Sequence, residues 1–140
     1  MFKSLTADIA VAAQISAEDC ARARDAGFAA IVCNRPDGED AGQPDAAEIA
    51  AAARAAGLRF VHIPVDARGI DDGMIAAMAA EIASGGPILA YCRSGTRSTN
   101  LWAQAAASGG VDADAIIAAA ARGGYDLAPM RGFLVRLAAG

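Results

Sequence analysis

Short uninterrupted apolar runs alternate with alanine-rich segments along most of this chain, and this alternation constrains the fold more than any other feature. A strand that is apolar on both faces needs cover on both sides, which helical crossovers provide when neighbouring strands are parallel. The pattern therefore predicts an α/β fold with a mainly parallel central sheet flanked by helices. The predicted strands are 8–15 (which also fits a hairpin), 28–34, 58–65 and 87–92, and the predicted helices between them are 16–26, 45–56, 72–84 and 98–108.

Helix boundaries follow from the residues at the ends of these segments. Ser16 and Asp45 are predicted N-caps, and glycines follow the predicted helix ends. Beyond about residue 110 the chain has a helical pattern only, and we expect this helical C-terminal part to pack onto the sheet. At 140 residues the chain has the length of one domain and can bury a core without disulfides, so we predict a single domain over 1–140.

Charge and composition exclude several classes of function. The net charge is −4, so no overall basic field favours nucleic acid or an anionic membrane. No apolar run approaches the ~20 residues of a spanning helix, and the N-terminal segment lacks a signal cleavage pattern, so we expect a cytoplasmic protein. The three cysteines, Cys20, Cys33 and Cys92, are an odd number without metal-like spacing. We therefore expect no disulfide framework, no metal site and no cofactor.

Three polar clusters follow predicted strands, at Asn34–Arg35, Asp66–Arg68 and Cys92–Arg97. The carboxyl ends of parallel strands meet at one edge of an open α/β sheet, which is where ligands bind in such folds. The sequence therefore predicts a functional site at this edge.

The third cluster has the strongest chemical character. A cysteine between a strand and a helix lies near free amide groups and the positive end of the helix dipole, which favour the thiolate. Gly95 permits a tight turn, and Arg97 can grip an oxyanion with its guanidinium fork. Ser98 can donate to the thiolate or cap the helix. The alternative is a buried strand-end cysteine beside an ordinary turn, but the combination favours a nucleophile in an anion cradle.

The remaining loop residues fit the same interpretation. Ser94 and Thr96 are small enough to leave the cradle open, and the amides of 93–98 can converge on one anion. Arg93 follows the cysteine directly and is expected to point outward, where it can contact substrate. Arg35 is expected either to recruit an anionic substrate or to be an ordinary surface charge. For Arg68 an ordinary surface charge is the favoured interpretation.

The segment YCRSGTRS (91–98) resembles the active loops of rhodanese-like sulfurtransferases and of cysteine-dependent protein phosphatases. NRPDGE (34–39), HIPV (62–65) and the tryptophan of STNLWA extend the likeness over about 5–110. The chain thus resembles the phosphatase-like domain that occurs alone in bacteria or ahead of a beta-lactamase-like hydrolase of the persulfide dioxygenase type. This resemblance implies a fold like that of dual-specificity phosphatases and makes a persulfide dioxygenase a candidate partner.

One departure bears on the chemistry. Tyrosine-phosphatase loops place histidine before the cysteine and five residues between cysteine and arginine, whereas here Tyr91 precedes Cys92 and four residues separate it from Arg97. A shorter ring of amides suits a persulfide better than a tetrahedral phosphoryl group. We therefore expect first a sulfurtransferase that carries a Cys92 persulfide, with thiosulfate or glutathione persulfide as donor. The alternative is a phosphatase that forms a Cys92 phosphoenzyme from a phosphate ester.

Asp66 is the candidate general acid for the phosphatase alternative, and a carboxylate turned away from Cys92 would favour sulfur transfer. Asp71 and Asp72 are better explained as caps of the helix that follows. A third hypothesis is a redox or anion sensor without enzymatic activity, for which Cys33 would be the resolving thiol. His62 is expected to be a core histidine.

Overall fold

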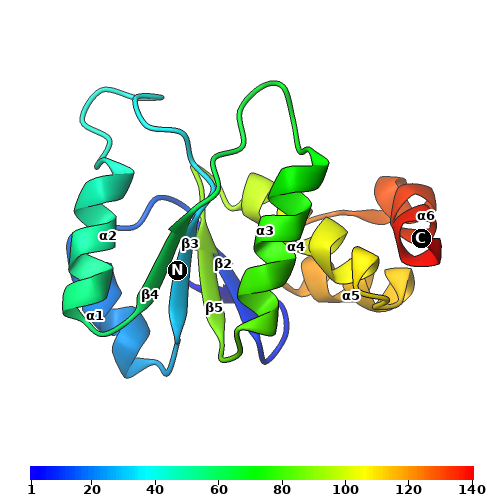
Figure 1. Ribbon diagram of the computed structural model, residues 1–140, viewed down its shortest axis with the longest axis horizontal. Helices are drawn as coiled ribbons and strands as arrows, with labels where there is room; N and C mark the ends of the chain where they lie inside the picture. The colour runs from blue at the N-terminus through cyan, green and yellow to red at the C-terminus, as the bar shows by residue number, and fades with distance from the viewer.

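The computed structural model describes all residues from 1 to 140 and contains a single five-stranded sheet with strand order β1-β2-β5-β3-β4 (Figure 1). β1 pairs antiparallel with β2, and the other neighbours are parallel, so the predicted mainly parallel α/β fold is confirmed. The strands are β1 (Lys3–Ser4), β2 (Ile9–Ala12), β3 (Ala30–Cys33), β4 (Arg59–His62) and β5 (Ile88–Tyr91). The helices are α1 (Ala17–Asp25), α2 (Ala46–Ala55), α3 (Asp72–Ala83), α4 (Thr96–Ser108), α5 (Ala113–Arg122), the 3-10 turn η1 (Ala128–Met130) and α6 (Arg131–Ala139).

Two hydrophobic layers sandwich the sheet, with α1 and α2 on one face and α3 and α4 on the other (Figure 1). Successive side chains of a strand point to opposite faces. In β3 and β5, Ile31 and Leu89 therefore pack under α1 and α2, whereas Val32 and Ala90 pack under α3 and α4. These central strands are buried on both sides, which explains why their sequences are apolar throughout.

Local hydrogen bonds set most helix starts. Ser16 caps α1 in a reciprocal capping box with Asp19, as its sequence position predicted. Asp45 is at the N-cap of α2 but its side chain makes no capping bond, and the first amide of the helix, that of Ala46, donates to Asp37 Oδ1 at 2.8 Å.

The start of α4 differs from the prediction by two residues. Gly95 has φ of 90°, a left-handed conformation that turns the chain at once into the helix, so α4 begins at Thr96 rather than at Ser98. The active-loop arginine, Arg97, therefore lies in the first turn of the helix.

The C-terminal part is helical, as predicted, but its principal neighbour is α4 rather than the sheet. α5 and α6 extend the helical layer on the α4 side (Figure 1) and bury Ile116 and Leu134 against it. None of the helices combines the length and apolar character that crossing a bilayer requires.

Candidate active site

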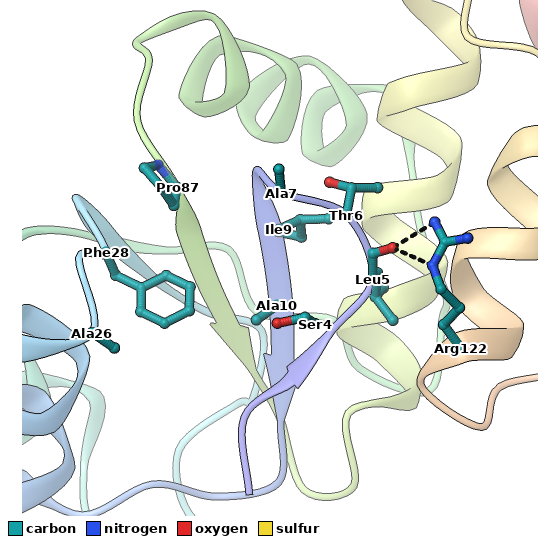
Figure 2. Close-up of a pocket in the computed structure, with 10 residues that line it drawn as sticks. All are labelled: Ser4, Leu5, Thr6, Ala7, Ile9, Ala10, Ala26, Phe28, Pro87 and Arg122. Carbon is teal, nitrogen blue, oxygen red and sulfur yellow. Dashed lines mark hydrogen bonds between the residues drawn. The ribbon is translucent and has the colours of Figure 1, made fainter.

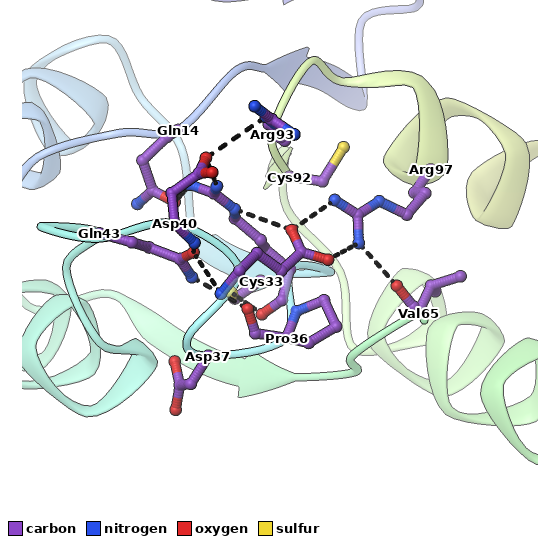
Figure 3. Close-up of polar contacts among 12 residues, drawn as sticks. Gln14, Cys33, Pro36, Asp37, Asp40, Gln43, Val65, Cys92, Arg93 and Arg97 are labelled. Atoms are coloured by element: carbon purple, nitrogen blue, oxygen red, sulfur yellow. Dashed lines mark hydrogen bonds and ion pairs between the residues drawn. The ribbon is translucent and has the colours of Figure 1, made fainter. Parts of the chain in front are cut away.

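Cys92 follows β5 directly and lies at the carboxyl edge of the sheet, where the predicted clusters meet (Figure 3). Its amide donates to the Ala12 carbonyl at the end of β2 at 3.3 Å, and the Asn34 amide donates to Tyr91 O at 2.8 Å. These bonds continue the pairing of the parallel strands beyond their ends. The sheet therefore fixes the backbone on both sides of the nucleophile candidate.

The sulfur of Cys92 lies on the floor of the loop and has no exposed surface. The Gly95 amide donates to it at 3.1 Å. Burial on its own raises the pKa of the Cys92 thiol. The Ser98, Ser94 and Gly95 amides and the Ser98 hydroxyl around the sulfur favour the thiolate, outweigh burial and hold this pKa below the ordinary value. By contrast, burial raises the pKa of Cys33.

The small loop residues form the walls of this cradle. Ser94 Oγ donates to Thr96 Oγ1 at 3.1 Å, and Thr99 Oγ1 donates to the Gly95 carbonyl at 2.8 Å, so the turn is braced from both ends. Ser98 Oγ is buried and has no hydrogen-bond partner within the protein. Its hydroxyl is therefore available to the sulfur or to an anion bound above it.

The Arg97 guanidinium is anchored at the rim of the cradle (Figure 3). It donates to both carboxylate oxygens of Glu39, at 2.7 and 2.8 Å, and to the Val65 carbonyl at 2.8 Å. Hydrogen bonds from Arg97 first, and then from Arg35, overcome partial burial and lower the pKa of Glu39 to about 2. Glu39 is thus a fixed negative partner of the arginine and cannot serve as a general acid at neutral pH.

Arg35 is a core element of the site rather than surface charge, since only 3% of the residue is exposed. Its guanidinium donates to Glu39 at 3.0 Å, to Asp40 at 2.6 Å and to Gln14 at 3.0 Å. These bonds occupy the groups that were expected to recruit substrate. Arg93 does point outward, as expected, with Asp40 at 3.4 Å.

Asp66 lies at the same edge of the sheet as Cys92 and directly follows Val65, whose carbonyl accepts from Arg97. Its carboxylate, however, pairs with Arg68. Arg68 donates to it through the backbone amide at 2.9 Å and through Nη2 at 2.8 Å. The Arg68 side chain is the main cause that lowers the pKa of Asp66, so the carboxylate is ionised at neutral pH. Asp71 caps α3 through the Met74 amide, in line with its predicted structural role.

Two other side chains considered from the sequence, Cys33 and His62, have neighbours of their own. Cys33 packs with Tyr91 in the layer under α1 and α2, with Sγ 3.4 Å from the Arg35 carbonyl. The prediction of a core histidine was wrong, because His62 is exposed on the edge strand β4, where Nε2 is 2.9 Å from the same carbonyl.

Sequence reasoning missed Glu39 as a functional residue, although it lies in the NRPDGE segment that carried the family likeness. An acidic residue in a turn-rich loop gives no local signal of its partner. Only the fold brings it to an arginine in a distant helix.

The largest cavity, of about 530 Å³, lies at the opposite end of the strands from Cys92 (Figure 2). Phe28, Pro87 and Ile9 line it near the amino ends of β3, β5 and β2. Arg122 closes one side by donating twice to the Leu5 carbonyl, at 3.1 and 2.9 Å. The polar cluster around Cys92 at the carboxyl edge is therefore separate from the largest cavity.

Comparison with known proteins places this architecture in a family. Residues 1–109 match the family of the beta-lactamase hydrolase-like protein, phosphatase-like domain. The chain belongs to this family. A beta-lactamase hydrolase-like protein of Agrobacterium fabrum is 40% identical over 77 residues, which are 54% of this chain and 18% of that protein. The matched segment thus spans less than a fifth of that relative.

Solved structures extend the match of this phosphatase-like domain to its C-terminal helices. A candidate phosphatase of Neisseria meningitidis is 34% identical, covers 97% of both chains and has a TM-score of 0.81. TpbA of P. aeruginosa, solved with phosphotyrosine in a cysteine-to-serine variant, is 18% identical, with a TM-score of 0.60 over 96% of this chain and 77% of its own. The second likeness concerns the fold, and both confirm the predicted phosphatase-like architecture.

Proposed function

We propose that this domain is a cysteine-dependent phosphatase that hydrolyses phosphate monoesters through a Cys92 phosphoenzyme. The observation that carries the proposal is the combination of loop amides directed at the Cys92 sulfur, which lower the pKa of its thiol, and Arg97 held beside the loop by Glu39. The phosphotyrosine bound to TpbA and the Neisseria candidate phosphatase support this function over sulfur transfer, which the loop length had favoured.

In the first step, the Cys92 sulfur attacks phosphorus, a sulfur–phosphorus bond forms and the ester oxygen leaves with a proton. The amides of 93–98 and the free donors of Arg97 bind the three non-bridging oxygens. These oxygens carry the negative charge of the phosphoryl group in the transition state. In the second step, water attacks the phosphocysteine, releases inorganic phosphate and restores the thiolate.

Asp66 is the proposed proton donor and acceptor. Its ionised form, paired with Arg68, suits the second step, in which it would take a proton from water. For the first step the carboxyl must be protonated and freed from Arg68. The Asp66 and Arg68 side chains are both exposed to solvent, so the carboxyl can leave Arg68 without any change in the core.

Sulfur transfer is the second candidate, and the four-residue spacing from Cys92 to Arg97 favours it. In that reaction the thiolate attacks the outer sulfur of thiosulfate, sulfite leaves, and the persulfide then passes its sulfur to a thiol. The orientation of Asp66 toward Arg68 agrees with this chemistry, which needs no acid. A persulfide dioxygenase as partner remains a prediction of the same hypothesis.

The deciding experiment compares three substrates with one protein. Purified domain is assayed with an aryl phosphate, with thiosulfate plus cyanide, and with glutathione persulfide, each alongside Cys92→Ser. Cys20→Ser is the matched control, because Cys20 is a buried thiol in α1 outside the loop. We expect Cys92-dependent turnover of the aryl phosphate. Turnover of the sulfur donors alone would instead establish sulfur transfer, and turnover that survives Cys92→Ser would refute both mechanisms.

A further inference from the structure

The peptide group between Ser94 and Gly95 is hydrogen-bonded at both ends. Its N–H donates to the Cys92 sulfur at 3.1 Å, and its carbonyl oxygen accepts from the Tyr125 hydroxyl at 2.9 Å. In a planar trans peptide the N–H and C=O bonds point in opposite directions. The tyrosine therefore fixes, from outside the loop, the direction in which the N–H points at the sulfur.

The Tyr125 hydroxyl has a second partner behind it. Lys3 Nζ is 3.4 Å from the hydroxyl oxygen and 5.0 Å from the ring centroid. A hydroxyl that accepts from an ammonium is a better donor to the next group, because hydrogen bonds in a chain polarise one another. The order of donation runs from Lys3 to Tyr125, through the Ser94–Gly95 peptide, and ends on the Cys92 sulfur.

Packing supports the same arrangement. A Cβ placed on Gly95 would collide with the Tyr125 hydroxyl and approach its ring. The tyrosine thus lies directly against the tightest point of the loop. It comes from the segment between α5 and η1, which lies outside the residues matched by the family, while Lys3 comes from β1.

We propose that Tyr125 is a positioning residue of the active loop, supported by Lys3, and that its hydroxyl holds the Ser94–Gly95 N–H on Cys92 and so stabilises the thiolate over the thiol. This inference rests on the part of the proposed function that makes Cys92 a thiolate nucleophile. It is independent of which group the thiolate attacks.

The test is a pH titration of the thiolate by its ultraviolet absorbance, which needs no substrate and no access of a reagent to the buried sulfur. Each variant is measured against its own Cys92→Ser form, so that tyrosine absorbance cancels. Tyr125→Phe keeps the ring and removes only the hydroxyl. We expect the ratio of thiolate to thiol at a fixed pH near the midpoint to fall by about two- to fivefold, as loss of one modest hydrogen bond implies.

Tyr91→Phe is the matched control. It removes a hydroxyl from the residue next to Cys92, but that side chain faces the α1 and α2 layer. We expect its titration to equal that of the unchanged protein. Lys3→Met should shift the thiolate titration in the same direction as Tyr125→Phe but by a smaller amount. Lys3→Arg keeps the positive charge and should titrate like the unchanged protein.

An unshifted titration for a folded Tyr125→Phe variant would overturn the proposal, and so would a lower melting temperature without any shift, because that result would mean packing alone. Since the titration requires no turnover, a domain that fails every phosphatase assay can still support this inference. A phosphatase whose titration is unmoved by Tyr125→Phe would keep the proposed function and lose only the role of Tyr125.

Discussion

Glu39 and Arg97 form a two-point ion pair between a turn-rich loop and the first turn of α4, 58 residues apart, with N–O distances of 2.7 and 2.8 Å. Arg97 also donates to the Val65 carbonyl. Three of the five N–H donors of a guanidinium are thereby occupied, and two remain for an oxyanion. The pair thus orients the arginine without using all of its binding capacity.

Glu39→Gln should reduce turnover while leaving the fold intact. The amide can accept only one of the two hydrogen bonds and carries no charge, so the guanidinium loses its fixed direction. Misplacing a catalytic group by about 1 Å can cost about 100-fold in rate, so we expect a loss of about 10- to 100-fold in kcat/KM. Steady-state assays with an aryl phosphate would measure it. Asp114→Asn is the control, since Asp114 forms an exposed ion pair with Arg131 far from the loop. An equal loss in both variants would contradict the role of Glu39.

The same ion pair makes stability depend on pH in a defined window. The pKa of Glu39 falls from 4.5 to about 2 on folding, so its contribution is complete above about pH 4.5 and is lost as the pH falls toward 2. We expect a contribution of about 1–3 kcal/mol, reduced by partial exposure to solvent. The free energy of unfolding, measured by denaturant titration at a series of pH values, should differ between the protein and Glu39→Gln at neutral pH and become equal near pH 2. Curves that stay parallel across this range would be inconsistent with the shift.

Gly95→Ala should destabilise the protein more than the same change at Gly110. Both glycines have left-handed φ, 90° and 95°, so both substitutions carry a backbone penalty of about 1–2 kcal/mol. Only at Gly95 does the new methyl group also meet Tyr125, whereas the space at Gly110 is open. We expect an additional loss of about 1–3 kcal/mol in the free energy of unfolding for Gly95→Ala. Equal losses would show that Tyr125 does not confine the loop.

Arg35→Met should be strongly destabilising. Its side chain is 4% exposed and joins Glu39 and Asp40, and its removal takes an ion-pair partner from each of these two partly buried carboxylates. We expect a loss of about 2–4 kcal/mol, measured by chemical denaturation. The matched change Arg24→Met, at an exposed pair with Asp25, should cost less than about 1 kcal/mol.

Asp66→Asn should slow turnover to an extent that depends on the leaving group of the substrate. If Asp66 protonates the leaving oxygen, the variant should lose about 10²- to 10⁴-fold in kcat/KM, which reports the first step, with an alkyl phosphate and far less with a nitrophenyl phosphate. Asp72→Asn, at an exposed position in the first turn of α3, is the control. A uniform effect on all leaving groups would remove Asp66 from the role of acid.

The order of elements could be predicted because the signals that define them are local. Apolar runs such as 28–34 and 87–92 are strands since both faces of the central strands are covered. The Ser16 capping box depends on residues three apart. Asp45 shows the limit of this logic, because the α2 amide is capped by Asp37 from the preceding loop.

The α/β architecture and the position of Cys92 at a strand-to-helix junction follow from the sequence, because periodicity and the Cys–Gly–Arg spacing are properties of neighbouring residues. Three features depend on the folded chain: which carboxylate holds Arg97, the burial of Arg35, and the approach of Tyr125 to the loop from the C-terminal part. These are contacts between segments tens of residues apart. Many acidic and aromatic side chains in the sequence are equivalent candidates for such contacts, and the packing of the loops and helices around the sheet selects among them.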